Sequence, residues 1–142
     1  MVVVTLVYNP FHHWETNMAT FAELYRPLLK EVFTLQARQQ LSAGADGLQS
    51  ARAYAERGKP DFVLAYLLLI DAPDEDKQEL LAYSYERRAT LSEQKAESLS
   101  EQFDRPFPLI KLEVQKDRMN AQRIRQGKRV RQDAATKMLR IN

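Results

Sequence analysis

The feature that most constrains the fold is a segment of about thirty residues, free of proline and glycine, between Pro73 and Pro106. Pro73 is followed by three acidic residues, 74–76, and this combination is typical of a helix start because the N-terminal end of a helix favours negative charge. The helical pattern continues to Phe103. A helix over 74–103 would be roughly 45 Å long at 1.5 Å per residue, which exceeds the radius of a small domain.

Apolar and small residues recur along this segment at intervals of three or four, which places them on one face of the predicted helix. Because the middle of that face carries small side chains, a partner helix could approach it closely. The residues of the face are Leu81, Tyr85, Ala89, Ser92, Ala96, Leu99 and Phe103.

Capping signals predict two further helix starts. Thr20 and Glu23 match a capping box, in which each side chain accepts a hydrogen bond from the other residue's backbone amide. Pro27 lies inside the apolar pattern that follows, and we expect it to kink this helix. Asp46 predicts the second start, and Gly58 marks the end of that helix. The apolar face of the first helix is expected to contain Phe21, Leu24, Leu28, Val32 and Leu35.

Two apolar segments leave helix and strand open as alternatives. Residues 62–70 are apolar on every side, so periodicity cannot separate a buried helix from a buried strand. Their leucine content and Pro60, which suits a first helical position, favour a helix. Residues 109–114 alternate between apolar and polar and would form a short strand paired with 2–8, unless Pro108 opens another helix.

These elements predict an all-α fold for the 142-residue chain, which has only four glycines and fits a single domain. We expect a bundle of four or five helices with one long helix over about 74–103. A minor two-stranded ribbon of 2–8 with 109–114 is the alternative to a purely helical chain. Met18 is a second credible translation start, so residues 1–17 are either native or an upstream extension.

The charge of the chain is divided unevenly. Residues 116–142 carry nine Lys and Arg side chains against Asp117 and Asp133, which gives a net charge of +7. Because the whole chain carries +2, residues 1–115 carry −5. We therefore divide the chain into a helical domain, 1–115, and a basic C-terminal helical segment or tail of the same domain, 116–142.

This basic segment is the strongest candidate site. Its cations could neutralise phosphates and bind nucleic acid without regard to base sequence. The segment has no interleaved aromatic residues for base stacking and matches no nucleic-acid-binding motif. The candidate polyanion-binding residues are Lys116, Arg118, Arg123, Arg125, Lys128, Arg129 and Arg131.

An acidic row on the long helix is the alternative partner of these cations. Residues 71–104 hold ten acidic and four basic side chains. Like charges four residues apart on a helix repel each other by about 0.2–0.5 kcal/mol per pair, and a cationic segment that folds back or comes from a second copy would relieve this. The candidate acidic docking ridge consists of Glu79, Glu86, Glu93, Glu97 and Glu101.

Other classes of site have little support. The absence of cysteine excludes a disulfide framework, a thiol nucleophile and a thiolate zinc site. His12 and His13 are the only histidines, and the chain has no cysteine that could complete a metal site with them. The carboxylates at 71–76 are explained by the helix start. Because no catalytic motif, phosphate loop or dinucleotide fingerprint occurs, we predict no enzyme, no cofactor and no metal site.

The sequence therefore predicts a non-catalytic helical protein–protein interaction or assembly module that self-associates. Its partner would be another protein or a second copy, and sequence-independent nucleic-acid binding through the basic segment is the alternative. The longest apolar run, 62–70, has nine residues, far fewer than the roughly 20 of a membrane-spanning helix. Residues 1–8 also lack the features of a signal peptide. We expect a cytoplasmic protein with no membrane partner.

Overall fold

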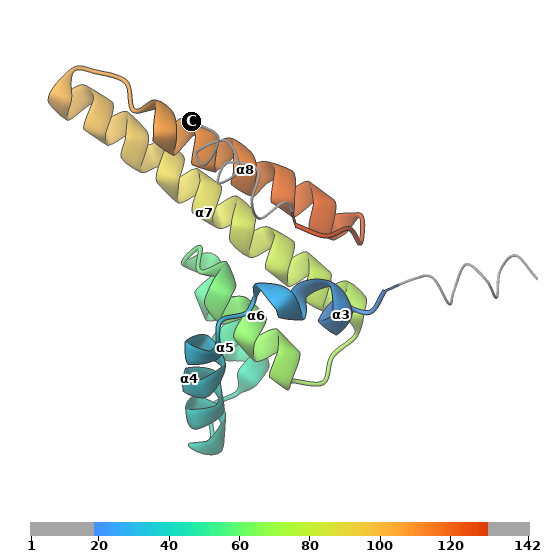
Figure 1. Ribbon diagram of the computed structural model, residues 1–142. Helices are drawn as coiled ribbons and strands as arrows, with labels where there is room; N and C mark the ends of the chain where they lie inside the picture. The colour runs from blue at the N-terminus through green and yellow to red at the C-terminus, as the bar shows by residue number, and fades with distance from the viewer. Residues whose placement is uncertain (1–18, 131–142) are drawn as a thin grey trace, which may run out of the picture.

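The computed structural model describes residues 19–130, and these residues form six α-helices, one short 3-10 helix and no strand (Figure 1). The all-α prediction is confirmed for this part of the chain, and the predicted long helix is present over 74–103. The predicted strand 2–8, both histidines and Arg131 lie outside the described residues. The elements are α3 (Phe21–Tyr25), η1 (Arg26–Leu28), α4 (Glu31–Ser42), α5 (Gly47–Glu56), α6 (Pro60–Leu69), α7 (Asp74–Phe103) and α8 (Pro108–Arg125).

Helices α7 and α8 form a long antiparallel hairpin, and the shorter helices pack near one end of it (Figure 1). Helices α3, α5 and α6 contact α7, and α4 packs on α6. The other end of the hairpin, where α7 turns into α8, extends past these shorter helices (Figure 1). The fold is therefore a small helical cluster with a projecting two-helix arm.

The apolar segment 62–70 forms the centre of the cluster. It is helical, as its leucine content favoured, and Pro60 is the first residue of α6. Five consecutive residues, 63–67, are buried, because α6 is covered by α4, α5 and α7. Aromatic rings continue this core outward, since Phe62 stacks on Tyr54 at 4.7 Å between ring centroids and meets the edge of Phe33 at 4.8 Å.

The prediction of a single helix that starts after Thr20, kinks at Pro27 and ends before Ser42 is wrong, because the chain breaks at Pro27 instead of bending. The capping box of Thr20 and Glu23 is present, but α3 ends at Tyr25 and Pro27 lies in the 3-10 helix η1. Proline has no amide hydrogen and collides with the carbonyl four residues earlier, so the α-helical pattern cannot continue through it. This break also explains why the described chain has six helices, where four or five were expected.

The break also changes which residues of α4 face the core. Val32 and Leu35, expected on the inward face, are 63% and 50% exposed. Phe33, Ala37 and Leu41, which follow one another at intervals of four, contact the core instead. A new helix start resets the rotation of the side chains about the axis, so the stripe read across Pro27 does not persist.

Of the two alternatives left open for 109–114, the strand is wrong and the helix opened by Pro108 is confirmed, because α8 begins at Pro108 and runs through this segment. A short strand would need a partner, and none of the described residues forms one. Helix α8 instead lies along α7, which supplies a partner for its whole length. The helix crosses residues 115 and 116 without interruption, so the change in charge at that point is not a break in structure.

The tight contact between the α5–α6 turn and α7 depends on Gly58. Its φ is +65°, and a Cβ at this position would lie 2.9 Å from the Arg88 backbone N and Cα. A side chain there would be strained and would also push the turn away from α7. Gly44 also has a positive φ, +95°, but nothing lies within 4 Å of its Cβ position.

We predict that Gly58→Ala lowers the free energy of unfolding by about 3 kcal/mol or more, because backbone strain and a steric clash act together. Gly44→Ala is the matched control and should cost only about 1–2 kcal/mol, from the positive φ alone. Urea unfolding followed by circular dichroism measures both. Equal losses in the two variants would show that the contact with α7 does not constrain this turn.

Candidate interaction surface

An ion pair between a buried carboxylate and a partly exposed arginine sets the position of α8 on α7. The Asp117 side chain is 4% exposed, and both of its oxygens accept hydrogen bonds from Arg88, at 2.9 Å from Nε and 2.8 Å from Nη2. The guanidinium also lies over the Tyr85 ring, 5.2 Å from its centroid. A buried carboxylate is costly unless it is paired, so this contact favours one register of α8 against α7.

Sequence reasoning did not identify this pair. The neighbours of Arg88 on α7, Tyr83 and Arg87, contact another helix instead of Asp117. Arg87 Nε donates to the Glu56 carbonyl at 3.0 Å, and the Tyr83 hydroxyl donates to the Glu56 carboxylate. The one available signal was Asp117 itself, an acidic residue in a strongly basic segment.

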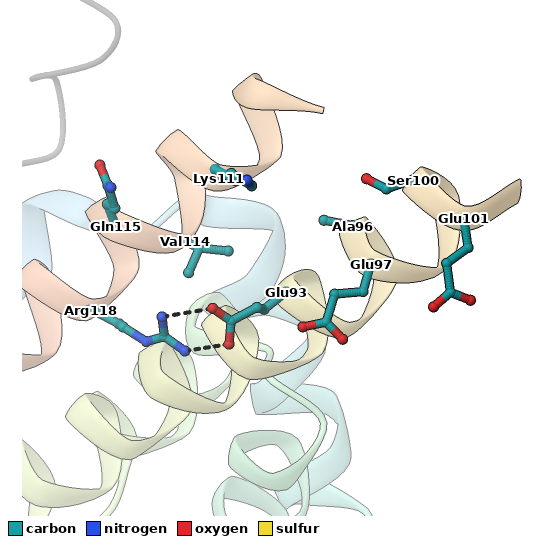
Figure 2. Close-up of a pocket in the computed structure, with 9 residues that line it drawn as sticks. All are labelled: Glu93, Ala96, Glu97, Ser100, Glu101, Lys111, Val114, Gln115 and Arg118. Atoms are coloured by element: carbon teal, nitrogen blue, oxygen red, sulfur yellow. Dashed lines mark hydrogen bonds and ion pairs between the residues drawn. The ribbon is translucent and has the colours of Figure 1, made fainter. Parts of the chain in front are cut away.

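Two of the predicted basic residues bind the predicted acidic ridge within the same chain. Arg125 forks between Glu79 and Glu86, with shortest N–O distances of 2.8 and 2.7 Å. Arg118 makes a two-pronged contact with Glu93 at 2.8 and 3.2 Å (Figure 2). Paired N–H···O bonds of this kind are the strongest that arginine forms with carboxylates.

These contacts shift the protonation of the partners. Hydrogen bonds from Arg125 lower the pKa of Glu86, and those from Arg118 lower the pKa of Glu93. The carboxylates in turn raise the pKa of both arginines. All of these groups are at least about a third exposed, so solvent screens each contact. These ion pairs therefore favour one alignment of α8 on α7 and contribute little to the stability of the fold.

The other four predicted basic residues within 19–130 lie apart from the ridge. Lys116 pairs with Glu113 one turn earlier on α8, at 3.1 Å. Arg123 Nε donates to the backbone carbonyl of Arg129. The side chains of Lys128 and Arg129 are exposed and form no ion pair with a described residue. The structure therefore divides the candidate polyanion site into paired and unpaired cations.

The remaining ridge residues, Glu97 and Glu101, line a groove of about 580 Å³ along the projecting arm. Its α7 wall carries these two carboxylates and Glu93, and its α8 wall carries Lys111, Gln115 and Arg118 (Figure 2). In Figure 2 the carboxylates of Glu97 and Glu101 point away from α8. The glutamates of the acidic ridge are thus paired with arginines near the helical cluster, and the two along the arm form no ion pair with a described residue.

The far end of α8 is tied to α3. The Tyr25 hydroxyl donates to the Lys128 carbonyl at 2.9 Å, and burial raises the pKa of this tyrosine to about 12, against the opposing charge of Arg123. The Phe21 amide donates to Asp74 Oδ2 at 3.1 Å, at the first residue of α7. Helix α3 therefore joins the start of α7 to the turn after α8, and Asp74 has a structural role.

Among the residues that the structure describes, no group of three or more His, Cys, Asp or Glu side chains could hold a metal ion. The carboxylates of the predicted cluster at 71–76 are exposed, and the one contact just given, that of Asp74, is structural. Within the same range, no helix is long and apolar enough to cross a membrane.

A second surface of the arm was missed by sequence reasoning. Large apolar side chains on the outer side of α8 and at the hairpin turn are exposed: Phe103 by 56%, Leu109 by 68%, Leu112 by 36% and Met119 by 43%. The strand interpretation places Leu112 on the same face as Ile110 and Val114. In the helix, Val114 is buried against α7 and Leu112 lies outside. The 3-4 spacing of 109, 112, 116 and 119 was the available signal.

We predict that Arg118→Gln/Arg125→Gln makes the thermal stability of the protein less dependent on acid pH. Glu86 and Glu93 have lowered pKa values in the folded state, so their contribution is complete above the unfolded value of about 4.5 and is lost as the pH falls through the folded values. Melting temperatures between pH 7 and pH 3 measure this. Below pH 4.5, the melting temperature of the wild type should fall by more than that of the double variant.

Lys128→Gln is the control, because this lysine has no carboxylate partner among residues 19–130. It should keep the acid dependence of the wild type. If the double variant kept that dependence as well, the two arginines would not be the groups that shift the glutamate titration.

Comparison with models of protein families, with curated proteins and with solved structures found no match for this chain. The surfaces of the chain itself are therefore the basis for assigning a function, and the projecting α7–α8 arm is the candidate that the geometry provides.

Proposed function

We propose that this protein is a non-catalytic helical interaction or assembly module that associates with another protein or with a second copy of itself. The observation that carries the proposal is the projecting arm with its exposed large apolar side chains. Isolated exposed apolar residues are common on protein surfaces, but apolar residues gathered on one surface are typical of interaction sites.

Two features of the sequence favoured self-association: the small residues of the α7 stripe and the complementary acidic and basic rows. In the structure, both are used in contacts within the chain. Ala89 and Ala96, small residues of the α7 stripe, are 0% and 5% exposed under α8. The acidic and basic rows meet through Arg118 and Arg125. The support for association therefore comes from the part of the surface that no described residue covers.

The tip of the arm is the part of this surface best suited to a second copy. Phe103 and Phe107 meet edge to face with centroids 6.3 Å apart, and Leu109 lies at the start of α8. Arg105 covers Phe107 at 5.2 Å from its centroid, which leaves Phe103 and Leu109 as the apolar contact points. Aromatic residues are enriched in protein interfaces for the area that they bury.

We predict that the full-length protein forms a dimer or larger assembly at high micromolar concentration, and that Phe103→Ser/Leu109→Ser weakens this association by about fivefold or more, since buried apolar anchors dominate such contacts. Sedimentation equilibrium over a concentration series measures the association constant. Both side chains are exposed, so the melting temperature of the monomer should change little.

Val32→Ser/Leu35→Ser is the matched control, because these side chains are exposed to a similar degree on α4, away from the arm. It should associate like the wild type. A strict monomer at all concentrations would remove self-association from the proposal, and loss of association only in the α4 variant would place the contact on a different helix.

Sequence-independent nucleic-acid binding is a second candidate, supported by one observation. Lys128 and Arg129 lie together after α8 with exposed side chains and no ion-pair partner among the described residues. Arg118 and Arg125, by contrast, face carboxylates and would have to leave them to meet phosphates. This candidate is therefore restricted to the end of α8 and the basic residues that follow.

If the chain binds nucleic acid in this way, Lys128→Gln/Arg129→Gln should weaken binding to random-sequence duplex DNA. The slope of log affinity against log salt should also fall, by about 0.9 for each phosphate that these two cations neutralise in the wild type. Gel-shift titrations of the full-length chain over a salt series measure both quantities. Lys111→Gln, at the opposite end of α8, is the control. No binding of the wild type at low salt would eliminate this candidate.

A further inference from the structure

We infer that the outer face of α8 is a docking site for an acidic amphipathic helix of another protein. The surface consists of Leu109, Leu112, Lys116, Met119 and Arg123, which we call the α8 stripe. The inference deepens the proposed function and rests on it, because it names the class of partner that this part of the arm would take.

The spacing of the α8 stripe is that of a helix–helix seam. Its five positions follow one another at intervals of three, four, three and four, the spacing by which one helix packs against another along a shared seam. Leu109, Leu112 and Met119 are exposed, and the opposite side of α8, with Val114, is buried on α7. The stripe is narrow, which suits a second helix better than a broad apolar surface such as a membrane.

The charges within the stripe determine the sign of the partner. Lys116 and Arg123 occupy two of its five positions, and neither pairs with a carboxylate on any other described helix. Among the described residues, the ion pair of Lys116 is with Glu113 on the same helix, a type of pair that contributes little to stability. A partner helix with glutamate or aspartate opposite these two cations could replace that weak contact. Apolar residues opposite the other three positions would complete the seam.

A second copy of α8 does not fit this seam. If two stripes met in antiparallel fashion about their centre, Lys116 would face Lys116 of the other copy. If they met in parallel, both cations would face their own equivalents. Like charges directly across an interface disfavour it. This restricts contact between copies to the uncharged start of the stripe and the tip of the arm, which is where the proposed self-association is centred.

Other parts of this chain fit the α8 stripe no better. The open acidic face of α7 near Glu97 and Glu101 exposes Gln94 and, one turn earlier, a single large apolar side chain, Leu91. It therefore offers charge without the three apolar positions of a seam. Residues 131–142 contain three basic residues and only Asp133 as an acid, and residues 1–18 contain only Glu15. Neither terminus has the negative charge that the stripe requires.

The test uses two synthetic helical peptides and the full-length protein. Both peptides carry leucine at alternating three- and four-residue intervals, and they differ only in flanking residues, which are glutamate in one and lysine in the other. Fluorescence anisotropy of the labelled peptides gives their affinities. We expect the glutamate peptide to bind and the lysine peptide to bind about tenfold more weakly or not at all.

Substitutions in the stripe separate its two components. Leu112→Ser/Met119→Ser should abolish binding of both peptides, and Lys116→Glu/Arg123→Glu should reverse the preference between them. Val32→Ser/Leu35→Ser on α4 is the control and should bind like the wild type. The apolar residues substituted here are exposed, whereas Lys116 and Arg123 are half-buried, so a melting temperature is measured for each variant to show that it is folded.

Several outcomes would overturn the inference. The first is that the glutamate peptide does not bind, and the second is that both peptides bind equally well. The third is that neither peptide binds, while the wild type binds anionic lipid vesicles and a stripe variant does not. Loss of self-association in Met119→Ser alone, which lies beyond the uncharged start of the stripe, would assign the stripe to a second copy, and this would overturn the inference and uphold the proposed function. A strict monomer that binds neither peptide would count against both.

Discussion

The contact between α7 and α8 determines most of what this chain exposes. It brings together two helices of unlike charge and aligns them by the ion pair of Arg88 and Asp117, whose carboxylate is almost inaccessible to water. Small side chains on α7, such as Ala89 and Ala96, allow α8 to lie close. Because the carboxylate needs its partner and the small residues leave room at defined positions, other registers of the two helices are disfavoured.

This register has consequences for charge. It places Arg125 between Glu79 and Glu86 and Arg118 beside Glu93, so part of the basic segment is neutralised within the molecule. The surface that the sequence offers to polyanions is reduced to the residues after α8, and the acidic ridge remains open only along the arm. The exposed pairs are individually weak, but as a row they all require the same alignment.

The same register leaves an apolar face uncovered. Helix α8 has one side on α7, a second side with the paired arginines, and a third that no described helix covers, with Leu112 and Met119 on it. The shorter helices cannot reach this face, because they pack on the other side of α7 and near its start (Figure 1). An arm that projects beyond its own core in this way is the physical basis for regarding the protein as an interaction module.

The sequence by itself determined the features that depend on near neighbours: the capping box at Thr20, the cap at Asp46 and the extent of 74–103. It also revealed the opposing charges of 71–104 and 116–142. Only the tertiary structure decided that 109–114 is helical, that Asp117 is buried and which carboxylate each arginine binds. The pairing of Asp117 and of the two arginines depends on contacts between residues 25–46 positions apart, which follow from the alignment of two helices and cannot be read from local periodicity.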